Sequence, residues 1–155
     1  MKTVVIGLGN PVRSDDAVGL RVACLVSEKM SSRPDVHVKE AYVGGLGLME
    51  AMAGFERAIV VDAMVTGIVE PGTIQAVPLS RRPATRNLAS SHDTSLPVAL
   101  ELGRALGLPM PDVIEVWGIE AQDVDTFSGE LTEAVARSVP LAAERIVGRI
   151  AERLS

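Results

Sequence analysis

Residues 2–11 read Lys2-Thr3-Val4-Val5-Ile6-Gly7-Leu8-Gly9-Asn10-Pro11, and Ser14-Asp15-Asp16 and Gly19 follow shortly after. The β-branched run predicts a strand over residues 2–6, because such side chains pack well on a pleated sheet. Gly, Asn and Pro then indicate a tight turn. A helix is expected over residues 15–31, and it begins with two carboxylates. The chain therefore opens with a strand–loop–helix unit whose loop carries acidic groups, not a phosphate-binding cradle.

Strand-like and helical patterns alternate along the rest of the chain. Further strands are predicted at 36–41, 58–62, 73–77 and 113–117, of which 73–77 is a candidate edge strand. Helices are predicted at 46–53, 96–106 and 132–154, with Pro140 expected to begin a new helix or to kink one. Residues 79–91 are rich in Ser, Arg and Pro and are expected to form a loop. This alternation predicts a single three-layer α/β/α domain over residues 1–155, with a twisted, mostly parallel sheet of about five strands.

Composition narrows the function classes. The net charge of −5 and an aromatic content of 3% disfavour a nucleic-acid partner, which usually requires a basic patch and stacking rings. No apolar run approaches the ~20 residues of a membrane span, so no membrane partner is expected. The single Cys24 excludes an internal disulfide and is expected to be a small buried side chain on the first helix. His37 is expected to be exposed and structural. We expect a cytoplasmic monomer.

Reactive side chains gather where the predicted strands end. Asp15 and Asp16 follow the first strand, Asp62 ends the strand at 58–62, and Glu120 follows the strand at 113–117. His92 lies just before the helix at 96–106. Ligands of open α/β sheets bind at the carboxyl ends of the strands. Asp16, Asp62 and His92 supply oxygen and nitrogen donors from three separate segments, so they are candidate metal ligands.

Each of these candidates also has a purely structural interpretation. Asp15 and Asp16 could complement a helix N-terminus that Ser14 caps. Asp62 could form a turn, and His92 could be a surface loop residue. Other catalytic templates are missing, because the chain contains no His-Glu-x-x-His helix, no Gly-x-Ser-x-Gly elbow and no Gly-Lys-Ser/Thr loop.

The motifs resemble those of the hydrogenase maturation proteases. The opening Gly-x-Gly-Asn-x-x-x-x-Asp-Asp/Glu-x-x-Gly of that family appears as Gly7 through Gly19. Further matches follow in the family's order along nearly the whole chain, at Val61-Asp62-Ala63, Pro71-Gly72-Thr73, Ser90-Ser91-His92, Gly118-Ile119-Glu120 and Gly129-x-Leu131-Thr132.

The resemblance implies an endopeptidase that removes the C-terminal extension of a nickel–iron hydrogenase large-subunit precursor. It places metal binding on Asp16, Asp62 and His92, and catalysis on Asp16 and Asp62. It further implies that Gly9, Asn10, Asp15 and Gly45 bind the substrate. Nickel is expected to arrive with the precursor, and the isolated protein could hold another divalent ion in its place.

One segment departs from the family, and two other functions stay open. Glu40-Ala41-Tyr42-Val43 stands where the family commonly has Asp-Gly-Gly-Thr, in a loop expected to line the substrate cleft. A non-catalytic module that only binds the precursor would use the same ligands. Peptidyl-tRNA hydrolases also begin with Gly-Leu-Gly-Asn-Pro. However, the region where they carry a catalytic His reads Val18-Gly19-Leu20-Arg21-Val22 here.

Overall fold

The fold is built on one five-stranded sheet with the strand order β2-β1-β3-β5-β4. A computed structural model describes residues 1–42, 46–78, 85–89 and 96–152. Four parallel strands form most of the sheet, and the edge strand β4 pairs antiparallel with β5. The strand bounds are β1 Thr3–Leu8, β2 Val36–Ala41, β3 Arg57–Met64, β4 Ile74–Pro78 and β5 Val113–Glu120.

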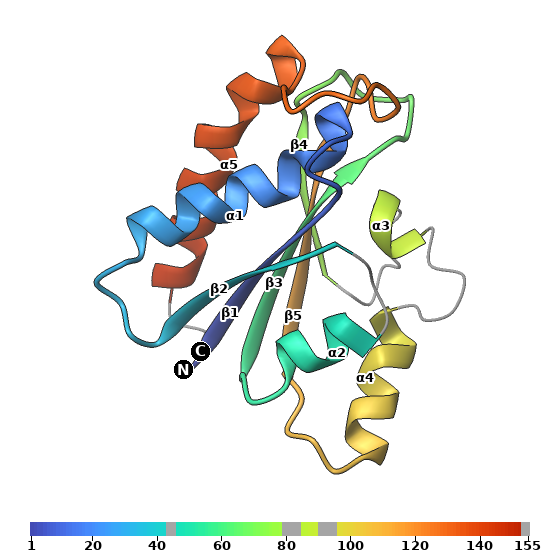
Figure 1. The fold of residues 1–155 in the computed structure, drawn as a ribbon. Helices are drawn as coiled ribbons and strands as arrows, with labels where there is room; N and C mark the ends of the chain where they lie inside the picture. Colours follow the sequence, from blue (N-terminus) through green and yellow to red (C-terminus); the bar gives the residue numbers. More distant parts are fainter. Residues whose placement is uncertain (43–45, 79–84, 90–95, 153–155) are drawn as a thin grey trace.

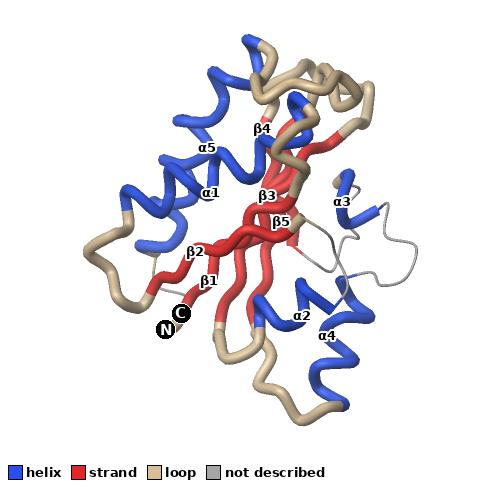
Figure 2. The backbone as a smooth tube through the Cα atoms, in the orientation of Figure 1, coloured by secondary structure: helices blue, strands red, loops and turns tan. Residues whose placement is uncertain are grey.

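Helices cover both faces of this sheet, as Figures 1 and 2 show. On one face lie α1 Val18–Lys29, which the 3₁₀ helix η1 Ser14–Ala17 precedes, and α5 Glu133–Ala151. On the other lie α2 Leu46–Met52, α3 Arg86–Ala89 and α4 Leu96–Ala105. The predicted α/β/α class and the five-stranded, mostly parallel sheet are confirmed. Within the described residues, no helix has the length and apolar character needed to cross a membrane.

Two hydrophobic cores result from the strand geometry. Successive side chains of a strand point to opposite faces of the sheet. Val5 and Ile59 therefore pack in the core beneath α1 and α5, whereas Val4 and Ile6 pack in the core beneath α2 and α4. All six residues of β1 are buried, so this continuously apolar strand occupies the interior of the sheet.

Gly19 allows α1 to approach the carboxyl ends of two strands. A Cβ atom at Gly19 would lie 2.3 Å from the carbonyl oxygen of Val61 and 2.5 Å from that of Leu8. Only a residue without a side chain fits at such distances. The close approach holds η1, and with it Asp16, beside the end of β3 that carries Asp62.

Several local predictions were wrong. β3 and β5 continue past Asp62 and Gly118, because the two strands pair as far as Met64 and Glu120. α5 continues through Pro140, so no new helix begins there, and its buried positions repeat every three to four residues while Leu141 is 52% exposed. Cys24 is exposed. His37 is exposed, as predicted.

Candidate functional site

The two candidate carboxylates both lie at the carboxyl edge of the sheet and are buried. Asp16 is on η1 and 3% exposed, and Asp62 is inside β3 and fully buried. Burying a charged carboxylate is costly unless it is paired or bound to an ion. The partners of these two carboxylates therefore decide what the site can do.

The short helix α3 contacts both carboxylates. Nε of Arg86 lies 3.2 Å from Oδ1 of Asp16, and the backbone N–H of Leu88 donates to Oδ2 of Asp62 at 3.3 Å. Oδ1 of Asp62 accepts from the backbone N–H of Ala63 at 2.9 Å. The sequence predicted only a loop over 79–91, so α3 and the role of Arg86 were missed. A basic residue in a polar stretch gives no signal of a partner seventy positions earlier.

The backbone conformation of Gly9 determines the path of the loop that leads to Asp16. This residue has a φ of +151°, and a Cβ added there would lie 2.1 Å from the carbonyl oxygen of Asp16. Asn10 closes the same turn, because its Oδ1 accepts from the backbone N–H of Val12 at 3.1 Å. Gly9 and Asn10 therefore shape the main chain that carries Asp16.

Ser14 is a strained residue immediately before the two aspartates. Its φ of 39° lies in the left-handed region that non-glycine residues rarely adopt. Its backbone N–H donates to the carbonyl oxygen of Ser128 at 3.0 Å, and its Oγ donates to that of Glu130 at 3.1 Å. The Ser14 hydroxyl therefore binds the distant loop at 128–130 and does not cap the helix.

Asp15 is fully buried, and four donors surround its carboxylate. Oδ1 accepts from the backbone N–H of Thr132 at 2.8 Å. Oδ2 accepts from the backbone N–H groups of Gln122 and Asp123, both at 2.9 Å, and from Oγ1 of Thr132 at 2.7 Å. Thr132 immediately precedes α5. Asp15 thus joins η1 to the loop after β5 and to the start of α5.

Glu120 holds a second loop, the one that follows β3, through hydrogen bonds of the same kind. It is the last residue of β5 and is 2% exposed. Its carboxylate accepts from the backbone N–H groups of Thr66 and Gly67, at 3.0 and 3.2 Å, and from Oγ1 of Thr66 at 2.5 Å. Glu120 therefore fixes the loop that follows β3.

The described residues contain part of the predicted site. Asp16 and Asp62 lie at the same edge of the sheet and contact the same helix, whereas His92 and Gly45 lie outside the described residues. Within the described part of the chain, no group of three His, Cys, Asp or Glu side chains is placed to hold a metal ion. His92 follows Leu88 by four positions in the sequence, directly beyond α3.

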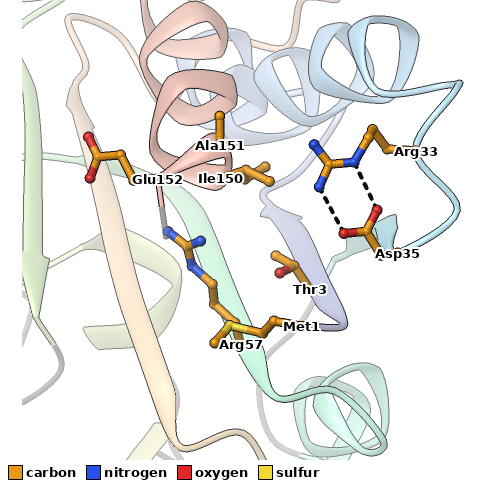
Figure 3. Close-up of a pocket in the computed structure, with 8 residues that line it drawn as sticks. All are labelled: Met1, Thr3, Arg33, Asp35, Arg57, Ile150, Ala151 and Glu152. Carbon is orange, nitrogen blue, oxygen red and sulfur yellow. Dashed lines mark hydrogen bonds and ion pairs between the residues drawn. The ribbon is translucent and has the colours of Figure 1, made fainter. Parts of the chain in front are cut away.

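A separate cavity of about 520 Å³ (Figure 3) is lined by residues at the amino-terminal ends of β1 and β3. Asp62 lies toward the other end of β3. The charged side chains that line it already have partners. Arg33 binds Asp35 through two hydrogen bonds, which lower the pKa of Asp35 to about 2. Nη2 of Arg57 donates to the carbonyl oxygen of Arg149 at the end of α5. These contacts explain the buried Arg57 as a structural residue.

Comparison with known proteins identifies relatives of this chain. A family model described as hydrogenase maturation protease matches residues 20–149. The hydrogenase 2 maturation protease of Escherichia coli K12 is 26% identical over 153 residues, which make up 98% of this chain and 92% of that protein. The hydrogenase expression/formation protein HupD of Rhizobium leguminosarum bv. viciae is 26% identical over 148 residues, covering 94% and 72% of the two chains.

Solved structures with the same fold agree with the sequence comparison. The hydrogenase maturating endopeptidase HybD of E. coli superposes with a TM-score of 0.77 at 22% identity, covering 97% of this chain and 92% of that one. The [NiFe] hydrogenase maturation protease HybD of Thermococcus kodakarensis gives a TM-score of 0.76 at 24% identity, covering 98% and 100%. At these identities the likeness establishes the fold, and the family model over residues 20–149 carries the classification.

Proposed function

The chain belongs to the hydrogenase maturation protease family, whose members are hydrolases that process hydrogenase precursors, and on that premise we propose its specific reaction. It removes the C-terminal extension of a nickel–iron hydrogenase large-subunit precursor after nickel has been inserted. Asp16, Asp62 and His92 recognise the nickel that the precursor carries.

The observation that carries this proposal is the position of Asp16 and Asp62. Two buried carboxylates, from η1 and from β3, meet one short helix that leads in the sequence to His92. Ligands of open α/β sheets bind at this edge. Two carboxylates and an imidazole suit a divalent ion of the nickel type, although such a donor set does not select nickel by itself. Selectivity for nickel therefore comes from the precursor that delivers it.

The chemistry then requires no serine or cysteine nucleophile. A divalent ion can polarise the scissile carbonyl or lower the pKa of an attacking water. One of the two carboxylates, Asp16 or Asp62, takes a proton from that water as general base. Both carboxylates would also help to hold the ion. The reaction is thus a peptide hydrolysis in which aspartates and substrate-borne metal act together.

The loops around Asp16 and Asp62 suit a polypeptide substrate. Exposed apolar side chains project from the loops that follow all four parallel strands, namely Val12, Tyr42, Val65, Ile68 and Phe127. Apolar groups exposed around a candidate site are typical of surfaces that bind other proteins. We assign substrate contact to these loops and to the main chain at Gly9, Asn10 and Gly45.

Asp15 takes a different part from the one that the family resemblance implies. Because four donors of this chain occupy its buried carboxylate, we assign it to positioning Asp16 rather than to contact with the precursor.

The test is to incubate the purified protein with nickel-loaded and nickel-free precursor and to read the products by mass spectrometry. We expect a shortened precursor only with the loaded form, and none with Asp16→Asn or Asp62→Asn. Asp112→Asn is the matched control, because Asp112 is an exposed aspartate at the opposite edge of the sheet. A stable complex without a shortened product would favour the non-catalytic module. Cleavage by either site variant would overturn the site assignment.

A further inference from the structure

The ion pair between Arg86 and Asp16 involves a carboxylate oxygen that, on the proposed function, would bind a metal ion. Nε of Arg86 is 3.2 Å from Oδ1 of Asp16, and the two side chains are 28% and 4% exposed. A carboxylate oxygen that ligates a divalent ion lies about 2.0–2.2 Å from it. The guanidinium and an ion would therefore compete for Oδ1 of Asp16, and their like charges would repel each other at this short range.

The Arg86 side chain can also move away from Asp16 without disturbing the rest of the fold. It is on a helix of four residues, and more than a quarter of its side chain already faces solvent. A long side chain of this kind can rotate its charged end into water while its stem stays packed. Asp16 is by contrast almost completely buried on η1, and its main chain packs against Gly9.

We propose that Arg86 neutralises Asp16 while no metal is present and has to be displaced when Asp16 receives a divalent ion. This inference rests on the proposed function, in which Asp16 is a ligand of the nickel carried by the precursor. If so, Arg86 lowers the affinity of the isolated protein for free divalent ions. An ion that a docked precursor brings to Asp16 can still displace Arg86. Arg86 is thus a specificity-determining residue of the metal site.

A purely structural ion pair would behave differently. Removing Arg86 takes a positive charge away from a buried carboxylate, so Arg86→Gln should lower stability on either interpretation. Only the proposed competition also predicts that the same substitution strengthens metal binding. Metal affinity, and not stability or activity, therefore separates the two interpretations.

The first experiment titrates Ni²⁺ into the purified full chain by calorimetry, for the wild type, Arg86→Gln, Arg86→Lys and Asp16→Asn. Arg86→Gln should bind Ni²⁺ roughly tenfold more tightly, which corresponds to about 1.4 kcal/mol. Arg86→Lys should stay closer to the wild type, because it keeps the positive charge. Arg104→Gln is the matched control, an exposed arginine on α4 whose loss should leave the affinity unchanged.

The outcomes separate this inference from the proposed function. If Asp16→Asn binds Ni²⁺ as the wild type does, Asp16 is not a ligand, and the proposed metal recognition fails. If Asp16→Asn weakens binding while Arg86→Gln matches the wild type, the competition fails and the proposed function stands.

A second measurement needs no stable variant of Arg86. Diamagnetic Zn²⁺ is added to ¹⁵N-labelled wild-type protein, and the arginine Nε–H resonances are followed by NMR. The Arg86 signal should move from the position of a carboxylate-paired guanidinium to that of a solvated one as Zn²⁺ binds. A signal that stays in place at saturating Zn²⁺ would overturn the inference.

Discussion

Replacing Asp15 with Asn should destabilise the protein far more than an aspartate substitution usually does. The carboxylate is fully buried and accepts four hydrogen bonds, from the backbone of Gln122, Asp123 and Thr132 and from the hydroxyl of Thr132. Asparagine has almost the same shape but only one acceptor oxygen. Its amide group must therefore face at least one N–H or O–H donor.

The magnitude follows from these contacts. A buried donor left without an acceptor costs about 1–3 kcal/mol, and hydrogen bonds to a charged group are roughly twice as strong as neutral ones. Asp15→Asn loses at least one bond and the charge assistance of the remaining ones, so we expect a loss of about 3 kcal/mol. Total stabilities of about 5–15 kcal/mol make this a large fraction.

The assay is urea unfolding of Asp15→Asn beside precursor cleavage, corrected for the folded fraction. Asp125→Asn is the control, since Asp125 is an exposed aspartate in the same loop region and should change stability by less than about 0.5 kcal/mol. A variant as stable as the wild type that no longer cleaves would refute the positioning role. Asp15 would then contact the substrate directly, as the family resemblance implies.

Two further predictions concern other parts of the molecule. Gly9→Ala should cost about 1–3 kcal/mol and reduce cleavage, because the new Cβ would lie 2.1 Å from the carbonyl oxygen of Asp16. Gly148→Ala is its control, because a Cβ there meets nothing within 4 Å. This substitution should stabilise α5 by about 0.5–1 kcal/mol. Full cleavage by Gly9→Ala would contradict the steric argument. The low pKa of Asp35, about 2, means that its pairing with Arg33 stabilises the fold above the ordinary carboxyl pKa and is lost as the pH falls toward 2. Arg33→Gln should return the Asp35 pKa to its usual range in an NMR titration, and an unchanged pKa would show that another group lowers it.

The fold was predictable because its signals are local. The β-branched runs of β1 and β3 and the glycines around residues 7–19 specify buried strands and a tight strand-to-helix connection within a few residues. Strand ends were less predictable, because they depend on a partner. β3 continues two residues beyond Asp62 because β5 pairs with it as far as Met64, which lies opposite Glu120. The backbone N–H of Ala121 then donates to the carbonyl oxygen of Met64.

The candidate site was predictable only in its acidic residues. Asp15 and Asp16 are adjacent and chemically identical, and the sequence could not separate their surroundings. The structure separates them through distant partners, because Asp15 binds the start of α5 whereas Asp16 binds Arg86 on α3. Residues 122–132 and 86 stand far from position 15 in the chain. No periodicity or spacing rule connects such positions.

Asp15, Glu120 and Asp16 are buried at one edge of the sheet, and their partners divide these three into two kinds. Asp15 and Glu120 accept chiefly from backbone N–H groups of loops, which cannot leave without unfolding those loops. Asp16 pairs with a side chain on a four-residue helix, and that side chain can rotate away without breaking any secondary structure. An arriving cation can replace a side-chain partner of this kind more easily than a backbone N–H group of a loop. Asp15 and Glu120 therefore hold the loops in place, while Asp16 has a partner that an arriving cation can replace.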